Sequence, residues 1–567
     1  MKVRRSLHAG PALRALNPAS PKKSTVSNAS RPTFLRSPRW LVLAPLAFLL
    51  VMLVAPVLRL MGEALSGDAG PALGMASDGL GGSAWLQPWL DPYLRWRLLW
   101  SALQAALTCG AVLVLGVPVA WVLARYEFVG RRWVLRALML PFVVPTLVAA
   151  MGVLALWGPQ GLWAQAGGAP LQDTPFLLLY GNVFFNLCVL VRSATDALEQ
   201  VSAARLAAAR TLGATPWRAF WRIEWPAILP WLMSALCLVF LYCFAGFGLA
   251  LVLGGQQYAT VEVEIYTLVA YELQLVAAGV LALWTLAITG ACAVLYAVLE
   301  RRLATPLRAD RVPRRVPRGA GQWLAVAGAL AVLVFFCLAP IAAIVLRAAL
   351  AGAQSWAVLW EPETLQALGN TLRFSAAALL LATVLGLCHA LAARHSAALR
   401  ALAFLPLVVS PVLVAFGLLL LYPSWTASVP LLIAAYALLA YPFVAKSVAS
   451  GLDGLPANLQ AAARSLGASP WRAFWRITWP LLLPALRRGM AFAAATAVGE
   501  FAVTLFLSRP EWATLSTLIY QYLGRPGAAN LDAALVLACA LIALALAAFL
   551  LIEWPGADPA NPQETHA

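Results

Sequence analysis

Residues 207–226 have the sequence AAARTLGATPWRAFWRIEWP, and residues 461–480 have the sequence AAARSLGASPWRAFWRITWP. We call them the first and the second repeat segment. They lie 254 residues apart and agree at 17 of 20 positions. The differences are Thr211 against Ser465, Thr215 against Ser469 and Glu224 against Thr478. This repetition predicts a chain of two related halves.

Each repeat segment is predicted to form a helix, a turn and a second, short helix. The alanine-rich start favours a helix that stops at Gly213, and Thr215 followed by Pro216 is typical of an N-cap and first turn. In the short helix the aromatic residues and the arginines recur at helical spacing, so one face is aromatic and another cationic. The residues concerned are Trp217, Phe220 and Trp221, and Arg218 and Arg222. Such a helix is expected to lie at a membrane boundary and to dock into a groove of a soluble partner.

The composition indicates a membrane protein. The chain has 567 residues, of which 62% are hydrophobic and 11% charged, and several apolar runs are long enough to cross a bilayer. Its formal charge of +17 fits the excess of Lys and Arg in cytoplasmic loops better than it fits nucleic-acid binding. We therefore expect the lipid bilayer, and no nucleic acid, among its partners.

Apolar length and basic loops predict an all-α polytopic protein of about twelve transmembrane helices in two parallel six-helix repeats. Acidic residues in the loops assigned to the outside support this orientation, which places both termini in the cytoplasm. Because each half has an even number of spans, a pore is expected between the halves, around a pseudo-two-fold axis along the membrane normal. The predicted spans are 40–61, 97–124, 135–157, 174–191, 227–253, 275–299, 322–346, 370–393, 400–421, 428–445, 482–507 and 531–552.

The spans divide the chain into two domains with three connecting or terminal segments. The expected first permease half is 40–299 and the second is 322–552, joined by a cytoplasmic linker, 300–321, that is rich in Arg and Pro. Residues 1–39 form a basic tail, expected to be cytoplasmic and disordered, and 553–567 form a C-terminal tail.

The repeated loops resemble the coupling motif of ABC-type importer permeases, which lies between the fourth and fifth spans of a six-span half. The central glycine corresponds to Gly213 and Gly467, while alanines stand where the motif has its glutamate, at Ala207 and Ala461. The resemblance covers roughly residues 40–552. It implies coupling roles for Ala208, Ala209, Gly213, Trp217, Phe220, Ile223 and Pro226, and for Ala462, Ala463, Gly467, Trp471, Phe474, Ile477 and Pro480. The alternative to a coupling role is that the two loops are interfacial anchor helices left by gene duplication.

The resemblance also implies the partners: two copies of a separate ATPase subunit, which use ATP and Mg²⁺, and a periplasmic solute-binding protein. This chain has only four lysines, and none completes a GxxxxGK[ST] phosphate loop, so ATP hydrolysis is expected elsewhere. The location implied is the bacterial inner membrane.

Two halves in one chain are similar to the fused permeases for thiamine and for ferric iron. WGPQGLW (157–163), FFNL (184–187) and CFAGFGLALVLGGQQYATVEVEIYTL (243–268) favour the thiamine branch, for thiamine, its phosphates or a pyrimidine precursor. Ferric iron remains the alternative.

The pore candidates are Glu500 and a pair of phenylalanines. A carboxylate within an apolar run is costly, so Glu500 contacts solute, lies in a water-filled cavity or pairs with an arginine. Its counterpart in the first half is Gly246. Phe247 and Phe501 occupy equivalent positions and form either an apolar gate or ordinary packing, whereas Glu262 and Glu264 are expected near the outer surface.

Other classes of protein fit less well. A twelve-span secondary transporter has parallel halves but needs no docking loop and usually places several ionisable groups near the midplane. A membrane enzyme would need an acid/base pair, a nucleophile or a metal site. The eight cysteines and four histidines show no ligand spacing, so we expect no metal and no cofactor bound by this chain.

Overall fold

The structure is a computed structural model that describes residues 39–65, 86–169, 171–172, 174–303, 312–426 and 428–553. Eleven of its helices are long and apolar enough to cross a membrane. The predicted N-terminal tail lies outside the described residues except for Arg39, and the C-terminal tail except for Glu553.

The first half begins with a span that is interrupted by one π-helical turn. Its elements are η1 (Arg39–Val42), α1 (Leu43–Leu49), η2 (Leu50–Val54), α2 (Ala55–Leu65), α3 (Gln87–Leu90), α4 (Pro92–Arg125), α5 (Arg131–Ala137), α6 (Leu140–Val143), α7 (Thr146–Trp157), α8 (Leu162–Gln165), α9 (Pro175–Glu199), α10 (Ala203–Thr211), α11 (Pro216–Ala219), η5 (Phe220–Glu224), α12 (Trp225–Phe244), α13 (Gly248–Leu253), α14 (Val261–Ala270) and α15 (Leu275–Leu303).

The long helices of the second half follow in the same order as those of the first, with different short helical turns between them. The elements of the second half are α16 (Ala320–Leu333), η6 (Val334–Leu338), α17 (Ala339–Leu350), α18 (Ala353–Trp356), η7 (Ala357–Trp360), α19 (Pro362–Ala392), η8 (Ala393–His395), α20 (Ala397–Leu402), α21 (Leu405–Val408), α22 (Pro411–Leu421), α23 (Val429–Asp453), α24 (Ala457–Ser465), α25 (Pro470–Ala473), η9 (Phe474–Thr478), α26 (Trp479–Val498), α27 (Ala502–Leu507), η10 (Pro510–Trp512), α28 (Leu515–Gly524) and α29 (Ala528–Glu553).

The offset found in the repeat segments extends through the helices on either side of them. Glu199 at the end of α9 corresponds to Asp453 at the end of α23, and the first residues of α12 and α26, Trp225 and Trp479, also correspond. The helix pairs α4 with α9 and α12 with α15 pack as α19 with α23 and α26 with α29 do. The predicted duplication is therefore a duplication of structure.

Four of the predicted spans are interrupted. Within 400–421 the backbone is extended at Val409, and Ser410 caps α22, which is a short apolar helix and not one of the eleven long spans. The equivalent break in 135–157 falls at Val144 and Pro145. Pro411 supplies no N–H at the start of α22, so a new helix begins there at little cost. The spans predicted at 227–253 and 482–507 break before α13 and α27.

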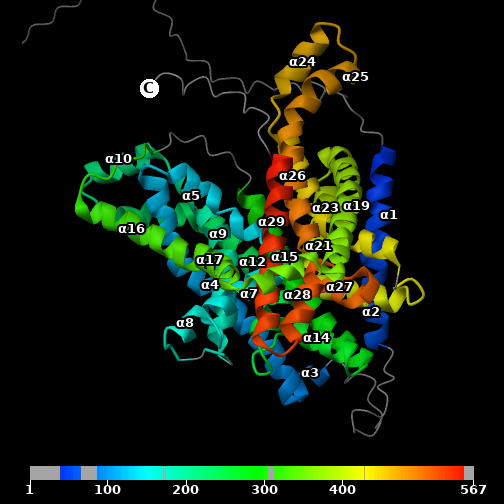
Figure 1. Ribbon diagram of the computed structural model, residues 1–567. Coiled ribbons are helices and arrows are strands. Elements are labelled where there is room, and N and C mark those ends of the chain that lie inside the picture. Colours follow the sequence, from blue (N-terminus) through cyan, green and yellow to red (C-terminus); the bar gives the residue numbers. More distant parts are fainter. Residues whose placement is uncertain are drawn as a thin grey trace, which may run out of the picture.

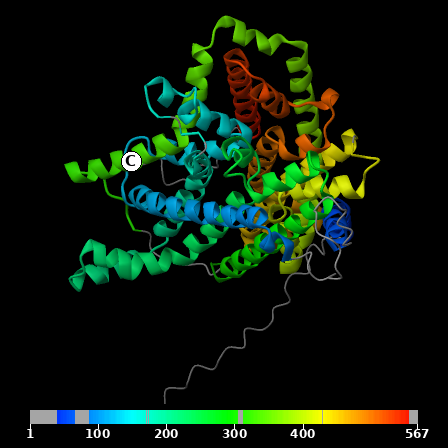
Figure 2. The same cartoon turned by 90° about the horizontal axis from the view of Figure 1, so that it is seen from below.

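The first span of each half crosses over to the other half. α2 packs on α22 of the second half, and α17 packs on α7 of the first. Figure 1 and Figure 2 show the blue first span beside the yellow helices of the second half. Each half therefore packs against the first span of the other half, and the two halves form one helical body.

The repeat segments lie at one end of this body, which we call the repeat end. α24 and α25 stand at the top of Figure 1 and α10 at its upper left, whereas α3, α8, α14 and α28 lie toward the bottom. We call that opposite end the far end. The long helix α4 joins the two ends.

Candidate functional site

Both repeat segments adopt the predicted helix, turn and second helix. Gly213 has φ 78° and Gly467 has φ 80°, a left-handed conformation that suits glycine. The Gly213 N–H donates to the Arg210 carbonyl over 3.0 Å, and the Gly467 N–H donates to the Arg464 carbonyl over 2.9 Å. These bonds satisfy carbonyls at the end of α10 and α24 and turn the chain toward the second helix.

The second helix is capped as the sequence predicts. The hydroxyl of Thr215 accepts a hydrogen bond from the Arg218 N–H over 3.3 Å, and Ser469 accepts one from Arg472 over 3.4 Å. A π-helical turn, η5 or η9, then leads without interruption into the fifth span. The short helix is thus a rigid extension of a transmembrane helix.

The two segments present the same apolar residues to solvent. Trp217 is 70% exposed and Trp471 is 69% exposed, and Trp221 and Trp475 are both 44% exposed. Neighbouring rings contact one another, with centroids 5.6 Å apart for Trp217 and Trp221 and 5.5 Å for Trp471 and Trp475. Exposed tryptophans next to arginines are typical of protein interaction sites.

The surface also contains a residue pair that sequence reasoning missed. Leu212 and Leu466 are each 87% exposed, directly before the glycine of the turn. Their position within an apparently helical, apolar stretch gave no signal of exposure, because the turn that projects them depends on the backbone conformation of the next residue. We call Leu212, Trp217 and Trp221 the first exposed surface, and Leu466, Trp471 and Trp475 the second.

The remaining predicted coupling residues divide between surface and packing. Ala208, Pro226, Ala462 and Pro480 are exposed; Ala209, Phe220, Ile223, Phe474 and Ile477 are half-buried; and Ala463 is buried. The half-buried side chains support the exposed ones.

The halves meet at a cluster of four aromatic rings. Phe247 and Phe501 stack with centroids 6.0 Å apart and an interplanar angle of 22°. Tyr266 lies 5.4 Å from Phe247, and its counterpart Tyr520 lies 5.3 Å from Phe501, measured between ring centroids. Phe247 and Phe501 are buried. Tyr266 and Tyr520 also lie 254 residues apart, so each half contributes one phenylalanine and one tyrosine to the cluster.

Glu500 lies beside this cluster and caps a helix. Its Oε1 accepts a hydrogen bond from the Val503 N–H over 2.9 Å, at the start of α27. The carboxylate therefore satisfies an orphan donor where the fifth span breaks. Glu500 is not among the residues that line the cavity described next.

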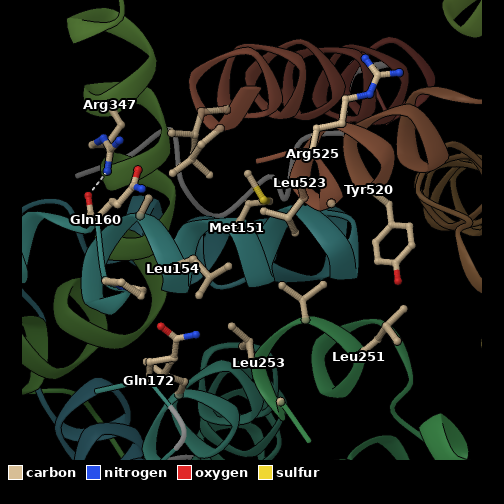
Figure 3. Close-up of a pocket in the computed structure, with 18 of the residues that line it drawn as sticks. Met151, Leu154, Gln160, Gln172, Leu251, Leu253, Arg347, Tyr520, Leu523 and Arg525 are labelled. Atoms are coloured by element: carbon tan, nitrogen blue, oxygen red, sulfur yellow. Dashed lines mark hydrogen bonds between the residues drawn. The ribbon is translucent and has the colours of Figure 1, made fainter. Parts of the chain in front are cut away.

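A cavity of about 810 Å³ lies at the far end between the halves. Its walls come from α7, α13, α17, α28 and α29, and Figure 3 shows Met151, Leu253 and Tyr520 around it. Two arginines, Arg347 and Arg525, line it as well. Arg347 donates to the Gln160 carbonyl and pairs with Asp532 at 3.4 Å. Because Tyr520 belongs to both, the aromatic cluster borders the cavity.

The expectation that Glu262 and Glu264 face the outside is wrong, because both are buried. Glu264 pairs with Arg97 at 3.2 Å and accepts a hydrogen bond from the Tyr93 hydroxyl over 2.9 Å. Glu262 accepts one from Ser410 over 2.7 Å, across the boundary between the halves. Burial raises the pKa of Glu262 to about 8, while the hydrogen bond from Ser410 acts in the opposite direction. This carboxyl is thus a buried contact between α14 and α22.

No group of three or more His, Cys, Asp or Glu side chains that could hold a metal ion occurs within the described residues. What the site offers is two matching exposed surfaces at one end, and an aromatic cluster and a cavity toward the other.

Comparison with known proteins gives relatives with transport functions. The chain is 29% identical to the thiamine transport system permease protein ThiP of Escherichia coli, over 71% of this chain and 78% of that protein. It is 28% identical to ThiP of Salmonella typhimurium, over 78% and 85%. It is 30% identical to a probable sulfate transport system permease protein, cysT, of Nephroselmis olivacea, but over only 25% of this chain and 51% of that protein.

The family described as binding-protein-dependent transport system inner membrane component matches residues 116–305 and 378–554, once in each half. Each match spans a repeat segment, its exposed surface and the helices on either side. The chain therefore belongs to the family of binding-protein-dependent transport system inner membrane components, as a two-half permease of an ABC importer.

Proposed function

We propose that this permease imports thiamine, a thiamine phosphate or a related pyrimidine precursor, and that its exposed surfaces each dock one copy of a separate ATPase subunit. The single observation that carries the docking role is the match between the first and second exposed surfaces in sequence and exposure. Two identical surfaces on a two-half chain fit two identical partner subunits.

The docking surfaces are connected directly to the membrane helices. Each short helix continues through a π-helical turn into α12 or α26, and these helices end beside Phe247 or Phe501. A push on the short helix is therefore applied to the span that carries one half of the aromatic cluster. ATP-driven closure of the ATPase pair would move the halves relative to each other in this way.

In the proposed mechanism the aromatic cluster is the gate. Phe247 and Phe501 stack across the boundary between the halves, and the far-end cavity ends against Tyr520. The far end faces the solute-binding protein, and both termini and the repeat end lie in the cytoplasm, in keeping with the basic loops there. Separation of the rings would open a path from the cavity toward the cytoplasm. Glu500 shapes this gate by capping α27 and needs no contact with solute.

The choice of solute rests on the relatives. Permeases of Escherichia coli, Haemophilus influenzae and Salmonella typhimurium that align over more than two thirds of this chain are named for thiamine transport. The lining of the cavity includes leucines, glutamines, two arginines and Tyr520. Thiamine is thus the better supported solute.

The test is uptake of labelled thiamine by cells that lack the gene and carry it back on a plasmid, with ferric iron uptake in parallel. The matched variants are Trp217→Ala with Trp471→Ala, which truncate both exposed surfaces, and Trp323→Ala, an equally large exposed tryptophan of α16 outside them. We expect the double variant to lose thiamine uptake and ATPase association. Truncation of a hot-spot tryptophan at an interface commonly costs about 2 kcal/mol or more of binding free energy. Trp323→Ala should retain both. Iron uptake that depends on the gene would overturn the solute, and normal ATPase association of the double variant would overturn the docking role.

A further inference from the structure

The two repeat segments differ chemically at one position. Thr211 and Ser465 each donate a hydroxyl hydrogen bond to the carbonyl three residues earlier, over 2.8 Å, and Thr215 and Ser469 both cap a helix. These two substitutions therefore preserve the local contacts. Glu224 and Thr478 do not match in this way: both are buried, at 3% and 2% exposed, but only Glu224 brings a charge.

Glu224 is engaged by two side chains of α4. Its Oε1 lies 2.6 Å from Nη2 of Arg125, and its Oε2 accepts a hydrogen bond from the indole N–H of Trp121 over 3.0 Å. The side chains of Arg125 and Glu224 are 11% and 4% exposed, so this pair is screened from solvent far more than a surface pair. Breaking such a pair leaves a buried charge without compensation, which is strongly unfavourable.

The same arginine also contacts the chain that leads into the first repeat segment. Nη1 of Arg125 donates to the Leu198 carbonyl over 3.3 Å, at the end of α9. One guanidinium thus joins the last turn of α9, before the segment, to the beginning of the fifth span, after it. The final residue of α4 thus contacts the chain before the segment and Glu224 near the segment's C-terminal end.

The linker between the halves reinforces this arrangement. The Arg315 N–H donates to the Arg125 carbonyl over 2.9 Å, and the Glu127 N–H donates to the Arg315 carbonyl over 3.0 Å. Arg314 pairs with Glu127 at 3.1 Å and with Glu199 at 3.0 Å. In the second half the residue that corresponds to Glu199 is Asp453, which pairs with Arg400 at 2.7 Å, and the two side chains are 53% and 35% exposed. Glu199 and Arg314 are 22% and 37% exposed, so the carboxylate is more buried in the first half.

α4 continues this connection to the aromatic cluster. It spans 34 residues, and near its other end Arg97 pairs with Glu264 of α14 at 3.2 Å and donates to the Gln256 carbonyl over 2.8 Å. α14 carries Tyr266, which contacts Phe247. One helix, which contains Pro118, therefore has a buried ion pair to the repeat segment at one end and a buried ion pair to α14 at the other.

We propose that Arg125 and Glu224 are a positioning pair that transmits movement of the first repeat segment through α4 to the gate, so that the first segment drives opening more strongly than the second. This inference rests on the proposed docking of ATPase subunits to both exposed surfaces. In the second half, α19 contacts α28 through hydrogen bonds: Thr371 accepts one from the Leu515 N–H over 2.9 Å, and Glu361 accepts one from the Tyr522 hydroxyl over 2.8 Å.

The chain supplies its own test substitution, because Thr478 shows which residue the equivalent buried position tolerates. The permease with Glu224→Thr is reconstituted with its ATPase and binding protein in proteoliposomes, beside the wild type and Asp453→Asn as the matched control in the second half. Three quantities are measured: ATPase copurification, ATP hydrolysis stimulated by the loaded binding protein, and solute taken up per ATP hydrolysed.

We expect Glu224→Thr to keep the ATPase bound, because the exposed surface is unchanged, and to lower uptake per ATP about fivefold, the scale of substitutions along a coupling network. Asp453→Asn should stay within about twofold of the wild type, as for an exposed pair. Glu224→Gln keeps the size of the side chain and an oxygen that accepts from Trp121, so its uptake per ATP should lie between those of Glu224→Thr and the wild type. If Glu224→Thr does not insert into the membrane, uptake per ATP of Glu224→Gln is the test.

The outcomes separate this inference from the proposed function. Wild-type uptake per ATP in both Glu224 variants overturns the positioning role while the docking role stands. If the Glu224 variants lose both ATPase binding and uptake, the pair serves to fold the docking surface, and the positioning role is also overturned. If the tryptophan double variant still binds the ATPase, the proposed docking fails instead.

Discussion

At the scale of single residues, the repeat segments depend on two glycines. Gly213 and Gly467 have positive φ, and a Cβ built on either would meet nothing within 4 Å. The requirement for glycine is therefore one of backbone conformation and not of space. Asparagine tolerates the left-handed region, whereas β-branched residues do not.

This distinction gives the first prediction. Gly213→Val with Gly467→Val should abolish uptake, because the strained turn no longer presents the exposed surface, while Gly213→Asn with Gly467→Asn should retain most of it. The strain of a non-glycine residue in this region is about 1–2 kcal/mol per site. Uptake and ATPase association of both double variants are the measurement. Equal loss of uptake in the valine and the asparagine double variants would mean that, in the complex, the partner subunit leaves no room for a side chain at these turns.

Glu500 shows how a residue can be conspicuous in sequence and ordinary in structure. Its charge within an apolar run left three roles open: contact with solute, a place in a water-filled cavity, or a pair with an arginine. The structure places it at a helix break, where its oxygen accepts a backbone N–H that has no partner in the helix. Sequence reasoning assumed a continuous span there, so the orphan donor could not be anticipated.

At the scale of elements, the crossing of the first spans depends on close contacts between glycine and proline. A Cβ on Gly417 of α22 would lie 2.9 Å from the carbonyl oxygen of Pro56 in α2. The same contact recurs for Gly152 of α7, where it would lie 2.8 Å from the carbonyl oxygen of Pro340 in α17. These glycines let two helix backbones approach closely, as small residues commonly do in membrane proteins.

The second prediction follows from this contact. Gly417→Leu should separate α2 from α22 and lower the stability of the purified permease by about 1–3 kcal/mol, the usual cost of overpacking. Gly328→Leu is the matched control, since a Cβ on Gly328 of α16 meets nothing within 4 Å. Thermal unfolding in detergent compares the two. A similar midpoint for both variants would show that α2 is not fixed against α22.

At the scale of the whole molecule, the aromatic cluster is where the halves touch and where the far-end cavity ends. Two buried rings that stack across a boundary exclude water only while the halves stay together. The cavity lies next to Tyr520 on one side of this boundary. The described arrangement is thus closed at the cluster and hollow beyond it.

The third prediction is that Phe247→Ala with Phe501→Ala opens a leak. Solute should then cross proteoliposomes without ATP or binding protein, because the truncated side chains no longer fill the boundary. Phe443→Ala with Phe492→Ala is the control: these rings also stack, with centroids 6.5 Å apart, but within the second half. The measurement is release of labelled solute from preloaded vesicles. If vesicles with Phe247→Ala and Phe501→Ala release no solute, the aromatic cluster is not the gate.

Much of the architecture could be predicted because it depends on local patterns. The membrane class follows from apolar length, the two halves from the repeated segment, and the helix–turn–helix from a glycine, a cap and a proline. Breaks within spans were missed at Val409 and Val144, because periodicity in a fully apolar run does not distinguish one helix from two.

The sequence by itself therefore determined the membrane class, the duplication and the conformation of the repeat segments, since each depends on neighbours along the chain. Only the tertiary structure decided that α2 and α17 cross between the halves, that Glu262 and Glu264 are buried, and that Arg125 joins the end of α9 to Glu224. Arg125 and Glu224 are 99 positions apart in sequence. Their contact arises from the packing of long helices, which no local pattern encodes.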